Sequence, residues 1–303
     1  MADSDQQKQT KEFFEKYASV WNENAKSDSK TNVNVVGLRN QFVEDACSQY
    51  LEKNAKTLDV GCGTGDLVIS LLRRRFDAYG VDFAASMIEK AQSDAKQAKL
   101  DPNRFSVKSI LDYDSDFKFD LISANGLIEY LSVDEYYDFV KKSHDLLAEN
   151  GIITIESRNR LFNIFSFNKY TEAEINLGQI NHLIEEAILF NSVKSLDELL
   201  TKGLKVKLDT NLHQHEFTGN EFINIKVDKR FQYTPFQLID KLKENGFKIL
   251  DLRPIHLHGI TTGAKMQDPE THTTLSYFLQ NKKNIHLNII PQASSFMIAA
   301  RKA

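Results

Sequence analysis

The chain has 303 residues, of which 41% are hydrophobic and 26% charged, and its formal net charge at pH 7 is −4. This length is enough for one large domain or two small ones, and the composition is ordinary for a soluble protein. The slightly acidic balance shows no electrostatic footprint for nucleic acid or an anionic membrane, so neither is expected as a partner.

The N-terminus and the cysteines bear on the compartment. Residues 1–11 are polar and lack the apolar core of a signal peptide, and no apolar run is long enough to span a bilayer. The two cysteines are Cys47 and Cys62, and Cys62 lies inside a glycine-rich turn, where a structural disulfide is not expected. We therefore expect a cytoplasmic protein.

Up to residue 157 the apolar pattern alternates between strands and helices. Two amphipathic helices, at 13–21 and 38–54, come before the first strand. The pattern then predicts strands at 57–60, 78–81, 105–108, 119–124 and 152–156, with helices at 66–75, 84–99 and 133–148. Such an array is typical of a parallel sheet with helices on both faces.

After residue 157 the regular rhythm breaks twice. A helix at 172–190 is expected in the first irregular stretch, a Thr-Pro pair begins a helix at 234–244, and strands follow at 247–252 and 295–300. Both irregular stretches follow strands on the side where open α/β sheets bind ligands. We expect one domain over 1–303: cap helices at 10–54, a core at 55–157 and 234–303, and lid-forming inserts at 158–233 and 253–292.

The most specific motif is T-L-D-V-G-C-G-T-G at residues 57–65. It reads as a strand that turns sharply into a helix, and glycines such as Gly61 and Gly63 let a ligand lie against the backbone. The next strand leads to Asp82, whose carboxylate is placed to bind the two hydroxyls of a ribose. Together these features predict a nucleoside pocket at the carboxyl edge of a parallel sheet.

The glycine spacing distinguishes between nucleoside cofactors. A dinucleotide fingerprint needs G-x-G-x-x-G, and Asp66 stands where its third glycine belongs, so it would repel a pyrophosphate. The pattern here is G-x-G-x-G, preceded by Asp59. It resembles motif I of the class I S-adenosylmethionine-dependent methyltransferases, whose cofactor carries an amino acid where NAD carries a pyrophosphate.

Two further segments carry the same resemblance. Residues 80–91, G-V-D-F-A-A-S-M-I-E-K-A, are similar to the G-V-D-x-S-x-x-M-I-x-x-A run of small-molecule methyltransferases, including those of ubiquinone and menaquinone synthesis. Residues 119–130 are similar to motif IV. The resemblance implies a Rossmann-like doubly wound sheet of seven strands, mostly parallel with an antiparallel last strand, and S-adenosylmethionine as cofactor with S-adenosylhomocysteine as product.

The resemblance also implies which residues hold the cofactor. Asp82 would bind the ribose, Phe83 would line the adenine pocket and Asn125 the methyl site. Arg39 would bind the methionyl carboxylate, a task that suits a guanidinium, although a surface arginine is an alternative. The full implied set is Tyr17, Arg39, Asp59, Gly61, Gly63, Asp82, Phe83, Met87, Ser109, Ile110 and Asn125.

One position departs from the family pattern. Relatives often place an acid just after the third strand to contact the adenine amino group, whereas this chain has Ser109 and Ile110 there and Asp112 further along. Either Asp112 takes over, or the backbone of Ile110 and a hydroxyl suffice.

Methyl transfer from a sulfonium is an in-line displacement, so the protein must align the reactants, exclude water and, where needed, remove a proton. Two H-x-H pairs, His213 with His215 and His256 with His258, suit a base or a metal site, because this spacing points both rings to one face of an extended segment. No third ligand stands at motif spacing, so no metal is expected. We predict His256 and His258 as candidate bases, since they follow the sixth strand; polar loop residues are the alternative.

The acceptor is less well specified. Residues 157–170, S-R-N-R-L-F-N-I-F-S-F-N-K-Y, leave the fifth strand with a mix suited to clamp a polar small molecule, or else form an apolar hinge. No N-P-P-Y run follows strand four, which argues against nucleic acid acceptors. The predicted activity is methylation of an oxygen or nitrogen of a small metabolite. A protein or peptide methyltransferase and a non-catalytic S-adenosylmethionine-binding scaffold stay open as alternatives.

Overall fold

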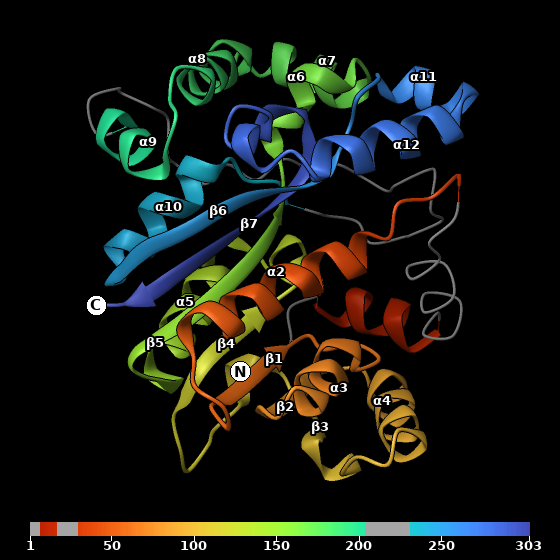
Figure 1. The fold of residues 1–303 in the computed structure, drawn as a ribbon, viewed down its shortest axis with the longest axis vertical. Helices are drawn as coiled ribbons and strands as arrows, with labels where there is room; N and C mark the ends of the chain where they lie inside the picture. Colours follow the sequence, from red (N-terminus) through yellow and green to blue (C-terminus); the bar gives the residue numbers. More distant parts are fainter. Residues whose placement is uncertain (1–6, 17–29, 204–230) are drawn as a thin grey trace.

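A computed structural model describes residues 7–16, 30–203 and 231–303. They form one seven-stranded sheet with helices on both of its faces (Figure 1). The strand order is β3-β2-β1-β4-β5-β7-β6, which confirms the predicted fold class. The strands are β1 (Lys56–Val60), β2 (Asp77–Asp82), β3 (Phe105–Val107), β4 (Phe119–Ala124), β5 (Leu147–Arg158), β6 (Phe247–Leu257) and β7 (Ala293–Lys302).

The last strand, β7, is antiparallel to both of its neighbours, β5 and β6, as predicted. The four pairings among the first five strands, β1–β2, β2–β3, β1–β4 and β4–β5, are all parallel. The chain order reverses between β1 and β4, because β2 and β3 lie on one side of β1 and the later strands lie on the other. Such a reversal leaves a crevice at the carboxyl ends of the strands, where open α/β sheets bind ligands.

The helices that cover the sheet belong to two separate apolar clusters. Leu121 of β4 belongs to one cluster and Ile122 to the other, and successive strand residues point to opposite faces. One face is covered by α2 (Val35–Tyr50), α3 (Asp66–Arg73) and α4 (Ala85–Gln97), and the other by α5 (Val133–Leu146) and α10 (Pro235–Glu244). The sheet is therefore doubly wound.

Local sequence signals explain where several helices begin. Ser132 and Glu135 form a capping box at the start of α5, in which each side chain accepts a hydrogen bond from the other's backbone N–H. Thr234 and Gln237 form the same device at α10, with Pro235 at the first helical position. These signals place the start of α10 where the sequence predicts it.

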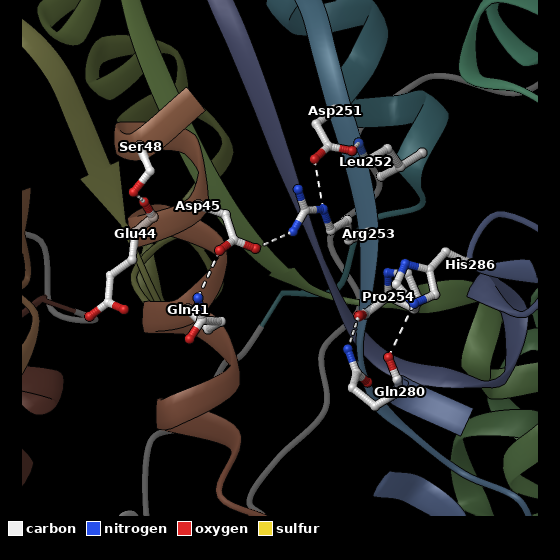
Figure 2. Close-up of polar contacts among 10 residues, drawn as sticks. All are labelled: Gln41, Glu44, Asp45, Ser48, Asp251, Leu252, Arg253, Pro254, Gln280 and His286. Carbon is white, nitrogen blue, oxygen red and sulfur yellow. Dashed lines mark hydrogen bonds and ion pairs between the residues drawn. The ribbon is translucent and has the colours of Figure 1, made fainter. Parts of the chain in front are cut away.

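The outer strand β6 is tied to helices on both sides (Figure 2). Asp45 of α2 receives a hydrogen bond of 2.7 Å from Nη1 of Arg253, whose Nε is 2.7 Å from Asp251. On the other side, Nε2 of Gln280, in helix α12 (Pro269–Gln280), donates to the carbonyl oxygen of Pro254 at 3.0 Å. These contacts fix both neighbouring helices to the carboxyl half of β6.

Some expected boundaries are wrong. Strand β6 runs to Leu257, beyond the predicted end at 252, so the second insert does not begin at 253. The strand continues through Pro254 because β6 lies at the edge of the sheet, where proline is tolerated. The helix expected at 172–190 is two helices, α7 (Lys169–Asn176) and α8 (Ile180–Asn191), separated by Gly178 with φ +69°. Strand β5 begins at Leu147, earlier than predicted.

The remaining described helices include one at residues 7–16 and three short ones, α6 (Asn163–Ser166), α9 (Leu196–Gly203) and α11 (Thr262–Gln267). Tyr17, Trp21, His213 and His215 lie outside the described residues. Among the helices that the structure describes, none is long and apolar enough to cross a membrane.

Candidate functional site

A cavity opens at the carboxyl ends of β1, β2 and β4, where the strand order reverses; we call it the switch-point cavity. Its lining comes from the ends of β1 and β2, from the segments after β1, β2, β3 and β4, from α2 and from the helix at 7–16. Every described residue of the predicted cofactor set lines it: Arg39, Asp59, Gly61, Gly63, Asp82, Phe83, Met87, Ser109, Ile110 and Asn125. The eleventh, Tyr17, lies outside the described residues.

The turn after β1 needs glycine at two positions for different reasons. Gly65 has φ +79°, and a Cβ there would lie 2.5 Å from the ring of Phe105. Gly63 has φ +52°, but no atom lies within 4 Å of where its Cβ would be. Positive φ values disfavour any side chain at both positions. Gly63 also borders the cavity, so its missing side chain leaves room for a ligand against the backbone.

Asp82 connects the ends of β1 and β2. Its Oδ2 accepts a hydrogen bond from the backbone N–H of Gly63 at 3.0 Å, and its Oδ1 accepts one from Ala84 at 2.9 Å. Burial raises the pKa of Asp82 from 3.8 to about 6, and these two hydrogen bonds lower it in part. Each carboxylate oxygen has a second lone pair. The group is thus fixed in the cavity wall with acceptor capacity left for ligand hydroxyls.

Asp59 is a second buried carboxyl group in the same wall. The hydroxyl of Ser123, its neighbour across the β1–β4 pairing, donates a hydrogen bond of 2.7 Å to Oδ1. Burial raises the pKa of Asp59 from 3.8 to about 7, and the charge of Asp82 raises it further, against the effect of the Ser123 hydrogen bond. A positively charged ligand group beside Asp59 would favour its ionised form.

Arg39 lines the cavity but already has a protein partner. Its Nη2 donates a hydrogen bond of 2.9 Å to Oε1 of Glu156, at the end of β5, and the backbone N–H of Gly126 donates to Oε2 at 3.0 Å. Burial raises the pKa of Glu156, and the charge of Arg39 opposes this rise. The Nε atom of Arg39 has no hydrogen-bond partner in the described structure. The sequence analysis missed Glu156, although an acid at a strand end was a usable signal.

Asn125 follows β4 and supplies an amide to the cavity. Neither its Oδ1 nor its Nδ2 has a hydrogen-bond partner within the described ranges, although both atoms are buried. Buried polar atoms are nearly always satisfied, so an amide in this condition fits a site that a polar ligand completes.

The residues after β3 differ in whether they border the cavity. Lys108, Ser109 and Ile110 line it, whereas Asp112 is not among its lining residues. Of the two options that the sequence leaves open for adenine, only Ser109 and Ile110 therefore have a place in the cavity wall.

The helix at 7–16 covers part of the cavity. The ring of Phe14 lies 5.5 Å from that of Tyr130 and 6.5 Å from that of Phe83, measured between centroids. Glu15 accepts hydrogen bonds from the backbone N–H groups of Ala85, at 2.6 Å, and Ser86, at 2.9 Å. A carboxylate at the N-terminus of α4 is favourable. The sequence analysis chose Tyr17 in this segment and missed Phe14, which its amphipathic pattern could have indicated.

The predicted bases are not part of this cavity. His256 and His258 are absent from its lining and meet His272 of α12, with one ring nitrogen from each within 4.8 Å of the others. The sequence shows no third ligand at motif spacing, and the third ring comes from a different element, 14 residues beyond His258. Burial lowers the pKa of His258 to about 2 and that of His272 to about 4.

The segment at 157–170 does not form the expected clamp. Arg160 is 2% exposed, and its Nε and Nη2 donate to the carboxylate of Glu174 at 3.0 and 2.8 Å. Asn163 donates to the same carboxylate at 2.8 Å. These side chains are held inside the protein, and no residue of this segment lines the cavity.

A G-x-G-x-G turn, an acid at the end of β2 and a sheet whose last strand is antiparallel are typical of methyltransferases that use S-adenosylmethionine. The chain belongs to the methyltransferase domain family, which matches residues 51–226. The protein is therefore an enzyme of this class, and S-adenosylmethionine is its cofactor.

Two relatives are similar in sequence to this chain over part of their length. A ubiquinone biosynthesis O-methyltransferase of Pelagibacter ubique is 29% identical over 167 residues, which are 52% of this chain and 68% of that protein. A carboxy-S-adenosyl-L-methionine synthase of Campylobacter hominis is 33% identical over 115 residues, 37% of this chain and 47% of that protein. The chain thus matches about half to two thirds of the length of these relatives.

Solved structures show the same fold. Magnesium protoporphyrin IX methyltransferase of Synechocystis PCC 6803, crystallised with S-adenosylhomocysteine, has a TM-score of 0.55 and 14% identity. The superposition covers 99% of this chain and 100% of that one.

Proposed function

We propose that this protein transfers the methyl group of S-adenosylmethionine to an oxygen, or else a nitrogen, of a small-molecule acceptor. The observation that carries this proposal is the switch-point cavity, where cofactor-type residues from separate strand ends line one space. The buried amide of Asn125 supports it, because it has no hydrogen-bond partner among the described residues and so needs a polar one.

The nucleoside half of the cofactor fits the end of the cavity near β2 and β3. Asp82 would accept hydrogen bonds from the two ribose hydroxyls with the lone pairs that Gly63 and Ala84 leave free. Phe83 and Ile110 would enclose the adenine, while Ser109 supplies a hydroxyl at its edge.

The methionyl half fits the groups after β1 and on α2. Its ammonium would lie near Asp59, whose raised pKa of about 7 would fall as the positive charge restored the ionised carboxylate. Its carboxylate would accept hydrogen bonds from the N–H groups of Arg39 that Glu156 does not engage. The hydrogen bond of 2.9 Å from Arg39 to Glu156 holds the guanidinium in place. Asn125 would then lie beside the sulfonium and the methyl group.

The transfer step needs alignment more than acid or base groups. A lone pair of the acceptor forms a bond to the methyl carbon, the carbon–sulfur bond breaks, and its electron pair remains on sulfur as S-adenosylhomocysteine. The acceptor then loses its proton. His256 and His258 lie outside the cavity lining, so we assign the removal of this proton to neither of them.

An oxygen acceptor is favoured by the relative from Pelagibacter ubique, whose name gives an O-methyltransferase of ubiquinone biosynthesis. A small acceptor is also consistent with the net charge of −4, which offers nothing to attract a polyanion.

The test is calorimetric titration with S-adenosylmethionine, S-adenosylhomocysteine and NAD in parallel, followed by acceptor screening. Micromolar binding of the first two and none of NAD is expected. Release of S-adenosylhomocysteine should then be measured with panels of hydroxylated and amino compounds and, separately, with a peptide library. Binding of NAD alone would overturn the cofactor assignment, and turnover with peptides alone would overturn the small-molecule acceptor.

A further inference from the structure

Three histidine rings meet away from the switch-point cavity. His256 is the second-last residue of β6, His258 directly follows that strand, and His272 comes from α12. One ring nitrogen of each lies within 4.8 Å of the other two. His258 and His272 are only 8% and 1% exposed. We call this group the histidine cluster.

The histidine cluster contains buried polar atoms that no residue in the described part of the chain satisfies. Both ring nitrogens of His258, and Nδ1 of His272, have no hydrogen-bond partner among the residues that the structure describes. Burying a polar atom without a partner is unfavourable. Three such atoms at one place fit a site that a bound ligand completes.

Hydrogen bonds to Ser294 fix how His256 presents its ring. The Ser294 hydroxyl oxygen lies 3.1 Å from Nδ1 of His256 and 3.4 Å from the carbonyl oxygen of the same residue. Both contacts are satisfied at once if Nδ1–H donates to the hydroxyl and the hydroxyl donates to the carbonyl. In that tautomer Nε2 of His256 is unprotonated, and its lone pair points toward His272. Metal-binding histidines are held by a partner of this kind on the other nitrogen.

The distance between two of the three nitrogens is close to that expected around a metal ion. Nε2 of His256 is 3.1 Å from Nε2 of His272. Two nitrogens at about 2.05 Å from a tetrahedral ion would be separated by about 3.3 Å. Without an ion, the same pair can form one hydrogen bond, but within the described ranges this leaves both nitrogens of His258 without a partner.

We propose that His256, His258 and His272 bind a divalent transition metal ion, such as Zn²⁺, through three imidazole nitrogens. Three neutral imidazoles suit Zn²⁺, Co²⁺, Ni²⁺ or Cu²⁺ and not Mg²⁺ or Ca²⁺, which prefer oxygen ligands. Three protein ligands leave a fourth position for water or another small ligand. This inference goes beyond the proposed methyl transfer and does not depend on it.

The surroundings hold the ligands in place and set the charge. Gln280 ties α12 to the carbonyl of Pro254, two residues before His256, so the elements that carry the ligands are fixed to each other (Figure 2). The ring of Phe162 packs 4.4 Å from that of His258. Lys265 is the cation whose charge acts on all three rings, and it would weaken metal binding.

The experiment is titration of the chelator-treated full-length protein with Co²⁺, followed by visible absorption, with Zn²⁺ as competitor. We expect one equivalent of Co²⁺ to bind with the ligand-field spectrum of a tetrahedral site and Zn²⁺ to displace it. His272→Gln should weaken binding at least about 100-fold. The matched control, His286→Gln, removes a nearby histidine whose Nε2 contacts the carbonyl of Gln280 and should leave binding unchanged.

Two further measurements separate a metal site from a structural role. Zn²⁺ should raise the Tm of the wild type and not that of His272→Gln. Lys265→Gln should bind Co²⁺ more tightly than the wild type, because a repelling charge is removed. Failure of the wild type to bind Co²⁺, or equal binding by His272→Gln, would overturn the proposal. Titration of the same samples with S-adenosylmethionine distinguishes that failure from a failure of the proposed function.

Discussion

Replacing Asp82 by asparagine separates its role in binding from its role in folding. The substitution keeps the shape of the side chain but removes the charge and one acceptor oxygen. A hydrogen bond to a charged group contributes about 1.5–3 kcal/mol. If the ribose hydroxyls lose one such bond and the second is weakened, affinity for S-adenosylmethionine should fall by about 2–4 kcal/mol, which is a rise in Kd of about 30-fold to 1,000-fold.

The effect of Asp82→Asn on stability should be small, because two contributions oppose each other. Burial raises the pKa of Asp82 from 3.8 to about 6, so ionisation at pH 7 costs the folded state about 3 kcal/mol, which the neutral amide avoids. Against this, the amide can accept from only one of Gly63 and Ala84, and an unsatisfied N–H costs about 1–3 kcal/mol. The free energy of unfolding should therefore change by less than about 2 kcal/mol.

The assay is calorimetric titration with S-adenosylmethionine beside urea denaturation of the same samples. The control is Asp77→Asn, at the opposite end of β2, where the carboxylate pairs with Arg104 away from the cavity. This control should bind the cofactor like the wild type. An unchanged Kd for Asp82→Asn, in a protein with wild-type stability, would refute the assignment of the ribose contact.

Gly63→Ala and Gly178→Ala each place a methyl group in open space at positive φ, 52° and 69°, so each should lower the free energy of unfolding by about 1–2 kcal/mol. Only Gly63→Ala should weaken S-adenosylmethionine binding, and equal affinities of the two variants in titration would contradict this. Between the unfolded pKa of 3.8 and the folded pKa of about 7, the folded state holds a proton on Asp59 that the unfolded chain has released, so stability falls as pH rises through this window by up to about 4 kcal/mol. Asp59→Asn should therefore stabilise the cofactor-free protein at about pH 8 but not at about pH 4 in denaturation curves, and the same gain at both would be inconsistent with this linkage. Arg160→Met removes the cation of a buried ion pair with Glu174 and should cost about 3–5 kcal/mol. Lys90→Met breaks an i,i+4 surface pair and should cost less than about 1 kcal/mol; similar shifts in the urea midpoint would argue against this difference.

The sequence determines the parts of this protein that depend on neighbours along the chain. The turn from β1 to α3 is encoded by glycines that alone tolerate its positive φ values, and the Thr234–Pro235 pair starts α10 through a local capping box. The pattern of apolar residues along the chain indicated each of the seven strands, and the spacing of the glycines indicated the cofactor. These signals are local, so they can be read without knowing how the chain packs.

Tertiary structure decided what distant segments do to one another. His272 reaches His256 only because α12 packs on β6, and no spacing motif records that contact. The sequence of residues 157–170 suits either a clamp for a small molecule or an apolar hinge, but only the packing shows that Arg160 of this segment is buried against Glu174. Strand β6 extends through Pro254 to Leu257 because it lies at the edge of the sheet, a position that the sequence does not show. A side chain's partner, and hence its burial and charge, is set by packing between elements, which chain neighbours alone do not specify.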